Sequence, residues 1–169
     1  MSDLWMLEDL EPWPDEPKSG AICAPTTFWA SPDTMELPPE VCTTLKVQVE
    51  AQQVGGRTER IAHLGGGFST VIGTGDGDIG EMTLTGCLVW DRYLWIDYRT
   101  QPEGDVRVRR RGHLVQRETL TPTKHDGWFS VSYTGPVEYQ AVGEVERAYG
   151  IRWNALTVEL GCAPGHLIV

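Results

Sequence analysis

Apolar and polar residues alternate along most of the chain after residue 43. In TLKVQVEA, residues 44–51, the odd-numbered positions are apolar and the even-numbered positions are polar or charged. This period of two is typical of a strand that buries one face. Similar segments follow, separated by turn sequences such as QPEG and KHDG: FSTVIG, EMTLTGCLVW, YLWIDYRT, DVRVRRR, HLVQRETL, WFSVSYTG, EVERAYGIRW and ALTVELG. The pattern therefore predicts a series of strands with short connections.

No amphipathic segment of helical length interrupts this series. We therefore expect an all-β fold of about eight antiparallel strands. Such a chain closes most readily as a barrel, because closure removes the exposed edges of an open sheet. An eight-stranded barrel has room inside for side chains and one small ligand. A sandwich of two sheets is the alternative fold.

The first 42 residues have a different character. A short helix is expected at the start, and Pro12 would end it. Residues 12–40 are rich in proline, which favours an extended segment that crosses a surface. A chain of this length most often forms one domain. We therefore predict a helical lid and an extended arm over residues 1–42 and a barrel over residues 43–169.

Negative charge is concentrated at the start of the chain. Residues 1–17 carry six carboxylates and no base, and the whole chain has a net charge of −10. We expect no nucleic-acid partner, because phosphate binding needs clustered bases that acids do not outweigh. No apolar run approaches the roughly 18 residues of a membrane span, and the acidic start resembles neither a secretory signal nor a transit peptide. A cytoplasmic location without membrane contact is therefore expected.

Residues that bind metals or attack substrates are scattered along the chain. The four cysteines form no C-x-x-C and the four histidines form no close pair, so we expect no metal site and no disulfide framework. GTGDGDIG contains a formal G-x-G-x-x-G, but it leads into a strand rather than a helix, and we interpret it as a hairpin turn. No nucleophile–base signature such as G-x-S-x-G is visible. An enzyme with this sequence is expected to work without a cofactor.

The segment RVRRRGHLVQRE, residues 107–118, holds five of the fourteen basic residues. On a strand, alternate arginines face outward while Arg110 faces the other way. Further along, Gln116 and Glu118 share a face with an apolar neighbour, as a ligand cavity would require. The basic segment is also the expected electrostatic partner of the acidic first residues, through ion pairs worth up to about 1 kcal/mol each when exposed.

Seven tryptophans and five tyrosines are the other unusual feature of the composition. Aromatic side chains of this kind fill cores, and they also build the walls of cavities that hold large apolar ligands. Both interpretations stay open for these residues. Aromatic walls with a few polar groups would suit a large polyene-like ligand.

Several segments together resemble a known family. FSTVIGTGDGDIG, HDGWFSVSYTG and GEVERAYGIRW look like the turns and strands of allene-oxide-cyclase-like β-barrels, which are lipocalin-like in shape. Within that group, the acidic, tryptophan-bearing first residues are similar to those of the bacterial spirotetronate and spirotetramate cyclases. Those enzymes are cofactor-free [4+2] cyclases, or Diels–Alderases, of polyketide biosynthesis, and in one branch an N-terminal segment folds over the barrel mouth as a lid. The resemblance covers residues 1–17 as lid and 43–162 as barrel.

The resemblance implies catalysis by orientation, because a pericyclic reaction needs a correctly folded substrate rather than an acid, a base or a metal. The expected substrate is a linear, hydrophobic polyene tetronate or tetramate. Donors that polarise its dienophile carbonyl are assigned to Gln116, His113, Arg110 and Tyr133. The substrate-binding set is Trp90, Trp95, Tyr98, Trp128, Trp153 and Glu118. The lid set is Leu4, Trp5, Leu7, Glu8, Asp9 and Trp13, with Glu8, Asp9 and Glu11 reaching for arginines.

Other functions are compatible with the same pattern. A lipocalin-like carrier would have the barrel and the lid without the reaction. An interaction module would use its acidic first residues to bind a basic partner protein. Another cyclase or isomerase could use the same barrel. The substrate and the oligomeric state, a homodimer included, are left open by the sequence.

Overall fold

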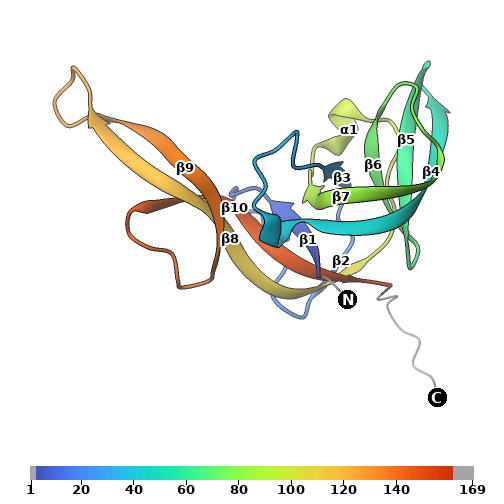
Figure 1. The fold of residues 1–169 in the computed structure, drawn as a ribbon, viewed down its shortest axis with the longest axis horizontal. Helices are drawn as coiled ribbons and strands as arrows, with labels where there is room; N and C mark the ends of the chain where they lie inside the picture. Colours follow the sequence, from blue (N-terminus) through green and yellow to red (C-terminus); the bar gives the residue numbers. More distant parts are fainter. Residues whose placement is uncertain (1–2, 162–169) are drawn as a thin grey trace.

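The computed structural model describes residues 3–161. The regular structure in this part of the chain is almost all strand, and no helix in it is long and apolar enough to cross a membrane. Figure 1 shows a barrel at one end and a long hairpin projecting at the other. The strands are β1 (Leu4–Glu8), β2 (Ile22–Cys23), β3 (Thr27–Ala30), β4 (Thr43–Val54), β5 (Arg57–Gly65), β6 (Phe68–Thr74), β7 (Gly80–Trp90), β8 (Val106–Pro122), β9 (Phe129–Ala141) and β10 (Tyr149–Leu160), and the helical turns are η1 (Pro39–Val41) and α1 (Leu94–Asp97).

Five strands close the barrel. The ladder runs β7–β3–β6–β5–β4, and β4 pairs with β7 to complete the ring. One strand, β7, can serve both neighbours because its residues 80–86 pair with β4 and its residues 87–90 pair with β3. Gly86 stands at the change of partner, where a Cβ atom would overlap the carbonyl oxygen of Ala30. The predicted barrel is therefore confirmed.

The expected number of barrel strands differs from the observed one. The ring has five strands rather than eight, and one of its pairings, β3 with β6, is parallel rather than antiparallel. The remaining strands β1, β2, β8, β9 and β10 extend the sheet away from the ring. An alternating pattern shows that a segment forms a strand but does not show which strand it pairs with, and this is why the count was wrong.

Side chains fill the inside of the ring. Val47, Val49 and Ala62 are buried together, and residues from β6 and β7 pack against them. A second cluster, formed by Ile61, Val71 and Leu94, holds α1 against the barrel. A ring of five strands is narrower than the eight-stranded barrels that accommodate a ligand. The barrel therefore acts as a packed core.

The first described strand lies in the middle of the extended sheet. All five residues of β1 are buried, and the strand pairs with β10 on one side and with β7 on the other. The short helix expected here is wrong. Leucines at positions 4, 7 and 10 have helical spacing, but a run of consecutive buried residues is the pattern of a central strand that is covered on both faces. Residues 3–42 therefore supply strands to the same sheet as residues 43–161.

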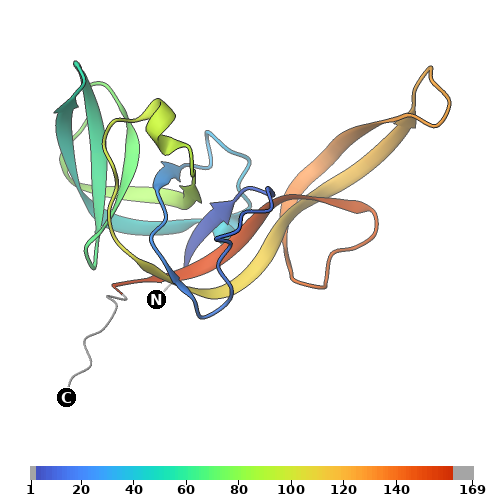
Figure 2. The ribbon, with the colours of Figure 1, turned by 180° about the vertical axis from the view of Figure 1, so that it is seen from behind.

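The longest strands form a hairpin that leaves the body of the protein. β8 pairs with β10 as far as Arg117, and beyond that point, among the described residues, β8 and β9 pair only with each other. Figure 2, which views the molecule from behind, shows this outer part projecting away from the barrel. We call residues 117–134 the arm.

Glu59 on β5 fixes the loop after α1 to the barrel. Its side chain is fully buried, and it accepts hydrogen bonds from the backbone N–H groups of Arg99 (2.9 Å) and Thr100 (2.6 Å). Arg57 Nη2 lies 2.5 Å from Glu59 Oε2. Burial raises the pKa of this carboxyl, but the hydrogen bonds outweigh burial and lower the pKa to about 2.

The lowered pKa predicts how acid affects stability. Ionised Glu59 stabilises the folded state above the ordinary value of 4.5, and this contribution is lost as the pH falls toward 2. Glu59→Gln should lower the free energy of unfolding at neutral pH by about 2 kcal/mol and should flatten the acid side of the stability profile. Urea unfolding at a series of pH values measures both effects.

The matched control for this prediction is Glu81→Gln, which changes an exposed carboxylate on β7. It should alter stability by no more than about 0.5 kcal/mol. An unchanged acid profile in Glu59→Gln would show that this carboxyl does not set it.

Candidate functional site

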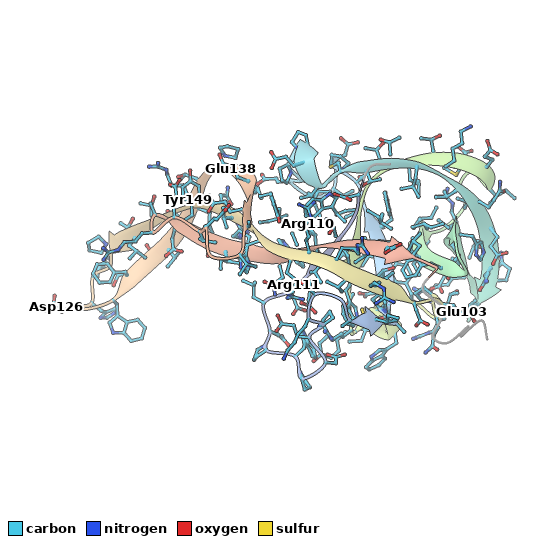
Figure 3. The ribbon with its side chains drawn as sticks, turned by 90° about the horizontal axis from the view of Figure 1, so that it is seen from below. Glu103, Arg110, Arg111, Asp126, Glu138 and Tyr149 are labelled. Atoms are coloured by element: carbon cyan, nitrogen blue, oxygen red, sulfur yellow. The ribbon has the colours of Figure 1, made fainter. Side chains whose placement is uncertain are left out.

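Glu8 pairs with the basic strand, as expected, whereas Asp9 and Glu11 form no ion pair within the described residues. Glu8 is buried between two guanidinium groups, with Arg92 Nη2 at 2.9 Å and Arg111 Nη2 at 3.2 Å from its oxygens. Asp15 and Glu16 contact the same two arginines from outside, at 3.0 Å and 2.6 Å respectively. Figure 3 shows Arg111 in the middle of the molecule, beside the N-terminal segment. We call these five residues the Glu8 network.

Aromatic contacts hold the segment after β1 in place. The guanidinium of Arg92 lies 3.8 Å from the ring centre of Trp90 and 4.7 Å from that of Trp13. Trp13 Nε1 donates to Asp9 Oδ1 at 2.5 Å. Cys23 lies near this network, and burial together with the charge of Glu8 raises the pKa of its thiol to about 11.

The structure places the lid residues in the sheet and in this network. Leu4, Trp5 and Leu7 belong to the hydrophobic core. Glu8 is the centre of the Glu8 network, and Asp9 and Trp13 bond to each other. Movement of this segment as a lid would require β1 to separate from two neighbouring strands. The segment is therefore a structural part of the sheet in this conformation.

The aromatic residues assigned to the substrate walls lie far apart. Trp90 is buried in the core, whereas Trp95 is exposed on α1 and Trp128 is exposed at the turn of the arm. Figure 1 places α1 and that turn in different parts of the molecule. Tyr98 is half-buried beside α1, where burial raises the pKa of its phenol. Trp153 is half-buried on β10, so the set does not line a common cavity.

Two of the four residues assigned to catalysis come together, and two lie elsewhere. Arg110 forms an exposed ion pair with Asp3, with 2.9 Å between Nη2 and Oδ2. His113 Nδ1 lies 3.1 Å from Asn154 Oδ1. His113 faces the side of β8 opposite to Gln116, because side chains alternate along a strand.

Gln116 and Tyr133 meet through Arg152. Arg152 Nη1 donates to Gln116 Oε1 at 2.5 Å, and its guanidinium lies 4.2 Å from the ring centre of Tyr133. Gln116 Nε2 donates to the carbonyl oxygen of Gly135 at 2.8 Å. The carboxamide thus uses both of its ends to hold Arg152 and the β9 backbone. Gln116 is in place to orient Arg152 across this face.

Glu118 completes the same polar cluster. It stands directly opposite Tyr133 in the β8–β9 ladder, and a Cβ atom at Gly150 would overlap both side chains. No ion pair of Glu118 is found within the described residues. We call Gln116, Glu118, Tyr133 and Arg152 the polar cluster. Sequence reasoning missed Arg152, because only the β8–β10 register brings it to Gln116.

Beyond the polar cluster, the arm has one apolar face and one polar face. Leu120 pairs with Val131 and Pro122 with Phe129, and residues directly opposite in an antiparallel ladder point to the same side. The residues between them are small and polar and point to the other side: Thr119, Thr121, Ser130 and Ser132. We call Leu120, Pro122, Phe129 and Val131 the arm face. Phe129, Leu120 and Val131 are 57%, 56% and 51% exposed.

Two adjoining hollows lie at the base of the arm. Each has a volume of about 360 Å³, and they share Glu36, Leu37 and Val137. Leu114 and Trp153 line one of them. Leu114 and Leu120 have the same parity on β8, so this groove and the arm face lie on one continuous side of the strand. The groove is lined mainly by apolar side chains.

Comparison with protein-family models, with curated proteins and with solved structures finds no match for this chain. The allene-oxide-cyclase-like resemblance therefore rests on the sequence segments alone. The cofactor-free [4+2] cyclase stays a prediction.

The Glu8 network predicts a large effect of a small change. Glu8→Gln removes the charge that faces two largely buried arginines, and we expect a loss of roughly 3 kcal/mol in the free energy of unfolding. Glu16→Gln, at the exposed end of the network, should cost no more than about 1 kcal/mol. Denaturant unfolding of the two variants measures the difference, and equal losses would contradict the central place of Glu8.

Proposed function

We propose that the chain is an assembly module, whose body docks on another protein through the arm. The observation that carries this proposal is the division of the arm into an exposed apolar face and a polar face. This interpretation belongs to the interaction class of functions, but it uses the arm rather than the acidic first residues. Those residues are already engaged by Arg92 and Arg111.

The physical argument concerns how a two-stranded ribbon keeps its shape. A hairpin alone is marginally stable in water, because it needs a third strand or a packed face. Within the described residues, the strands of the arm pair only with each other beyond Arg117. Large exposed apolar patches rimmed by polar residues are typical of protein–protein interfaces. A partner on the arm face would supply the missing layer.

Hydrogen bonds at the base of the arm hold its orientation relative to the body of the protein. Gln116 and Arg152 tie β8, β9 and β10 together just where the arm leaves the body. β8 itself continues without interruption from the core to Pro122. Preorganisation of this kind lowers the entropy lost when two surfaces bind.

Site-specific photo-cross-linking tests the proposal. A photoreactive phenylalanine analogue replaces Phe129 on the arm face in one variant and Ser130 on the polar face in another. In cells that express the chain from its own gene, we expect a protein adduct of defined mass from position 129 and little from position 130. The two positions are adjacent, so they serve as matched controls for expression and exposure.

Two results would count against an assembly role. One is the absence of a protein adduct at position 129. The other is equal labelling at positions 129 and 130, which would indicate random collisions rather than a docked face.

A further inference from the structure

We infer that the partner of the arm is a second copy of this chain, bound about a two-fold axis so that the arm of each copy lies on the groove at the base of the other copy's arm. This inference rests on the proposed function and specifies its partner. A two-fold contact requires a surface that is complementary to itself, since the same patch is used on both subunits. The side of β8 that carries the arm face has this property.

The pattern along β8 is symmetric about a point between Gln116 and Glu118. Leu114 lies at the apolar groove three positions before Arg117, and Leu120 lies on the arm face three positions after it. At about 3.3 Å per residue, each is roughly 10 Å from the midpoint. Leu114 itself is buried at the floor of the groove, so rotation about an axis there brings Leu120 of one copy over the groove of the other. Apolar surface then meets apolar surface on both sides of the axis.

The charges near the axis are also complementary. Glu118 lies on the arm side of the midpoint and has no ion pair within the described residues. Arg152 is held on the body side by Gln116 and has an exposed side chain. The same rotation places each Glu118 opposite the second copy's Arg152. Two ion pairs would therefore form, one on each side of the axis.

The area is sufficient for a stable dimer. If a large side chain has roughly 150–200 Å² to bury, the exposed fractions of the arm face and Tyr133 amount to surface on the order of 400 Å². If each groove loses as much accessible surface as the arm face that covers it, the two contacts bury on the order of 1,600 Å² in total, which is the standard size of a specific interface. Each groove hollow of about 360 Å³ is within the range that holds a small ligand and can admit apolar side chains.

Net charge favours contact at the arm over contact elsewhere. The chain as a whole carries −10, so two copies repel each other over much of their surface. The arm is balanced, with two basic and two acidic residues: Arg117, Lys124, Glu118 and Asp126. Figure 3 shows Asp126 at the end of the arm and Glu103 at the opposite end of the molecule. Two copies that meet through their arms keep their barrels apart.

A charge-exchange experiment tests the geometry. In Glu118→Arg homodimers, two guanidinium groups would face each other at each pair, and in Arg152→Glu homodimers two carboxylates would do so. Each variant alone should dimerise with a dissociation constant raised about 10-fold or more. An equimolar mixture should form a heterodimer, because both pairs then regain opposite charges. Sedimentation velocity of the purified full chains measures the species.

Three controls keep the result interpretable. Leu120→Thr on the arm face should also weaken the dimer by about 10-fold or more, whereas Thr119→Ser on the polar face should leave it unchanged. Circular dichroism and thermal unfolding confirm that each variant is folded. Recovery in the mixture cannot arise from misfolded chains, so it supports the two-fold contact even if Arg152→Glu loses some stability.

The outcomes separate this inference from the proposed function. A purified chain that remains monomeric at all concentrations overturns the dimer, and so does a mixture that fails to associate. If position 129 then still cross-links to a different protein in cells, the assembly role stands with another partner. If the purified chain is monomeric and position 129 forms no protein adduct in cells, both proposals fail.

Discussion

The fold depends on one buried carboxylate. Glu8 is almost completely inaccessible, and a buried charge is costly unless it is paired and hydrogen-bonded. Its two partners come from different segments, Arg92 after β7 and Arg111 on β8. Two arginines around one carboxylate leave a positive excess, which Asp15 and Glu16 offset from the outside. Asp3 pairs with Arg110, so four of the six carboxylates in residues 1–17 contact arginines, which accounts for most of the acidity of this segment.

The barrel and the arm face opposite physical demands. The barrel is a narrow ring whose apolar side chains are satisfied internally. The arm has no second layer within the described residues, so its apolar side chains are exposed. The polar cluster around Gln116 lies at the boundary between the two, where its hydrogen bonds connect β8 to β9 and β10.

Sequence periodicity predicted the strand-rich fold and its closure, because alternation along a segment such as residues 44–51 directly reflects one buried face. It could not predict that β7 pairs with three different strands, since pairing depends on register rather than on local pattern. It placed Gln116 and Glu118 on a shared face, but it could not bring Tyr133 or Arg152 to them, because those residues arrive from β9 and β10. It misread β1 because a fully covered strand does not alternate.

The place of β1 has a consequence for how the protein folds during synthesis. β1 pairs with β10, so that Leu4 stands opposite Val158 at the far end of the described chain. Contacts between such distant segments form slowly, because the entropy of closing a long loop must be overcome first. An apolar strand made early must therefore wait for one made late, and it is open to wrong pairings in the meantime. The acids that follow β1 keep that waiting segment charged, and so they protect it from aggregation before they take up their places around the arginines.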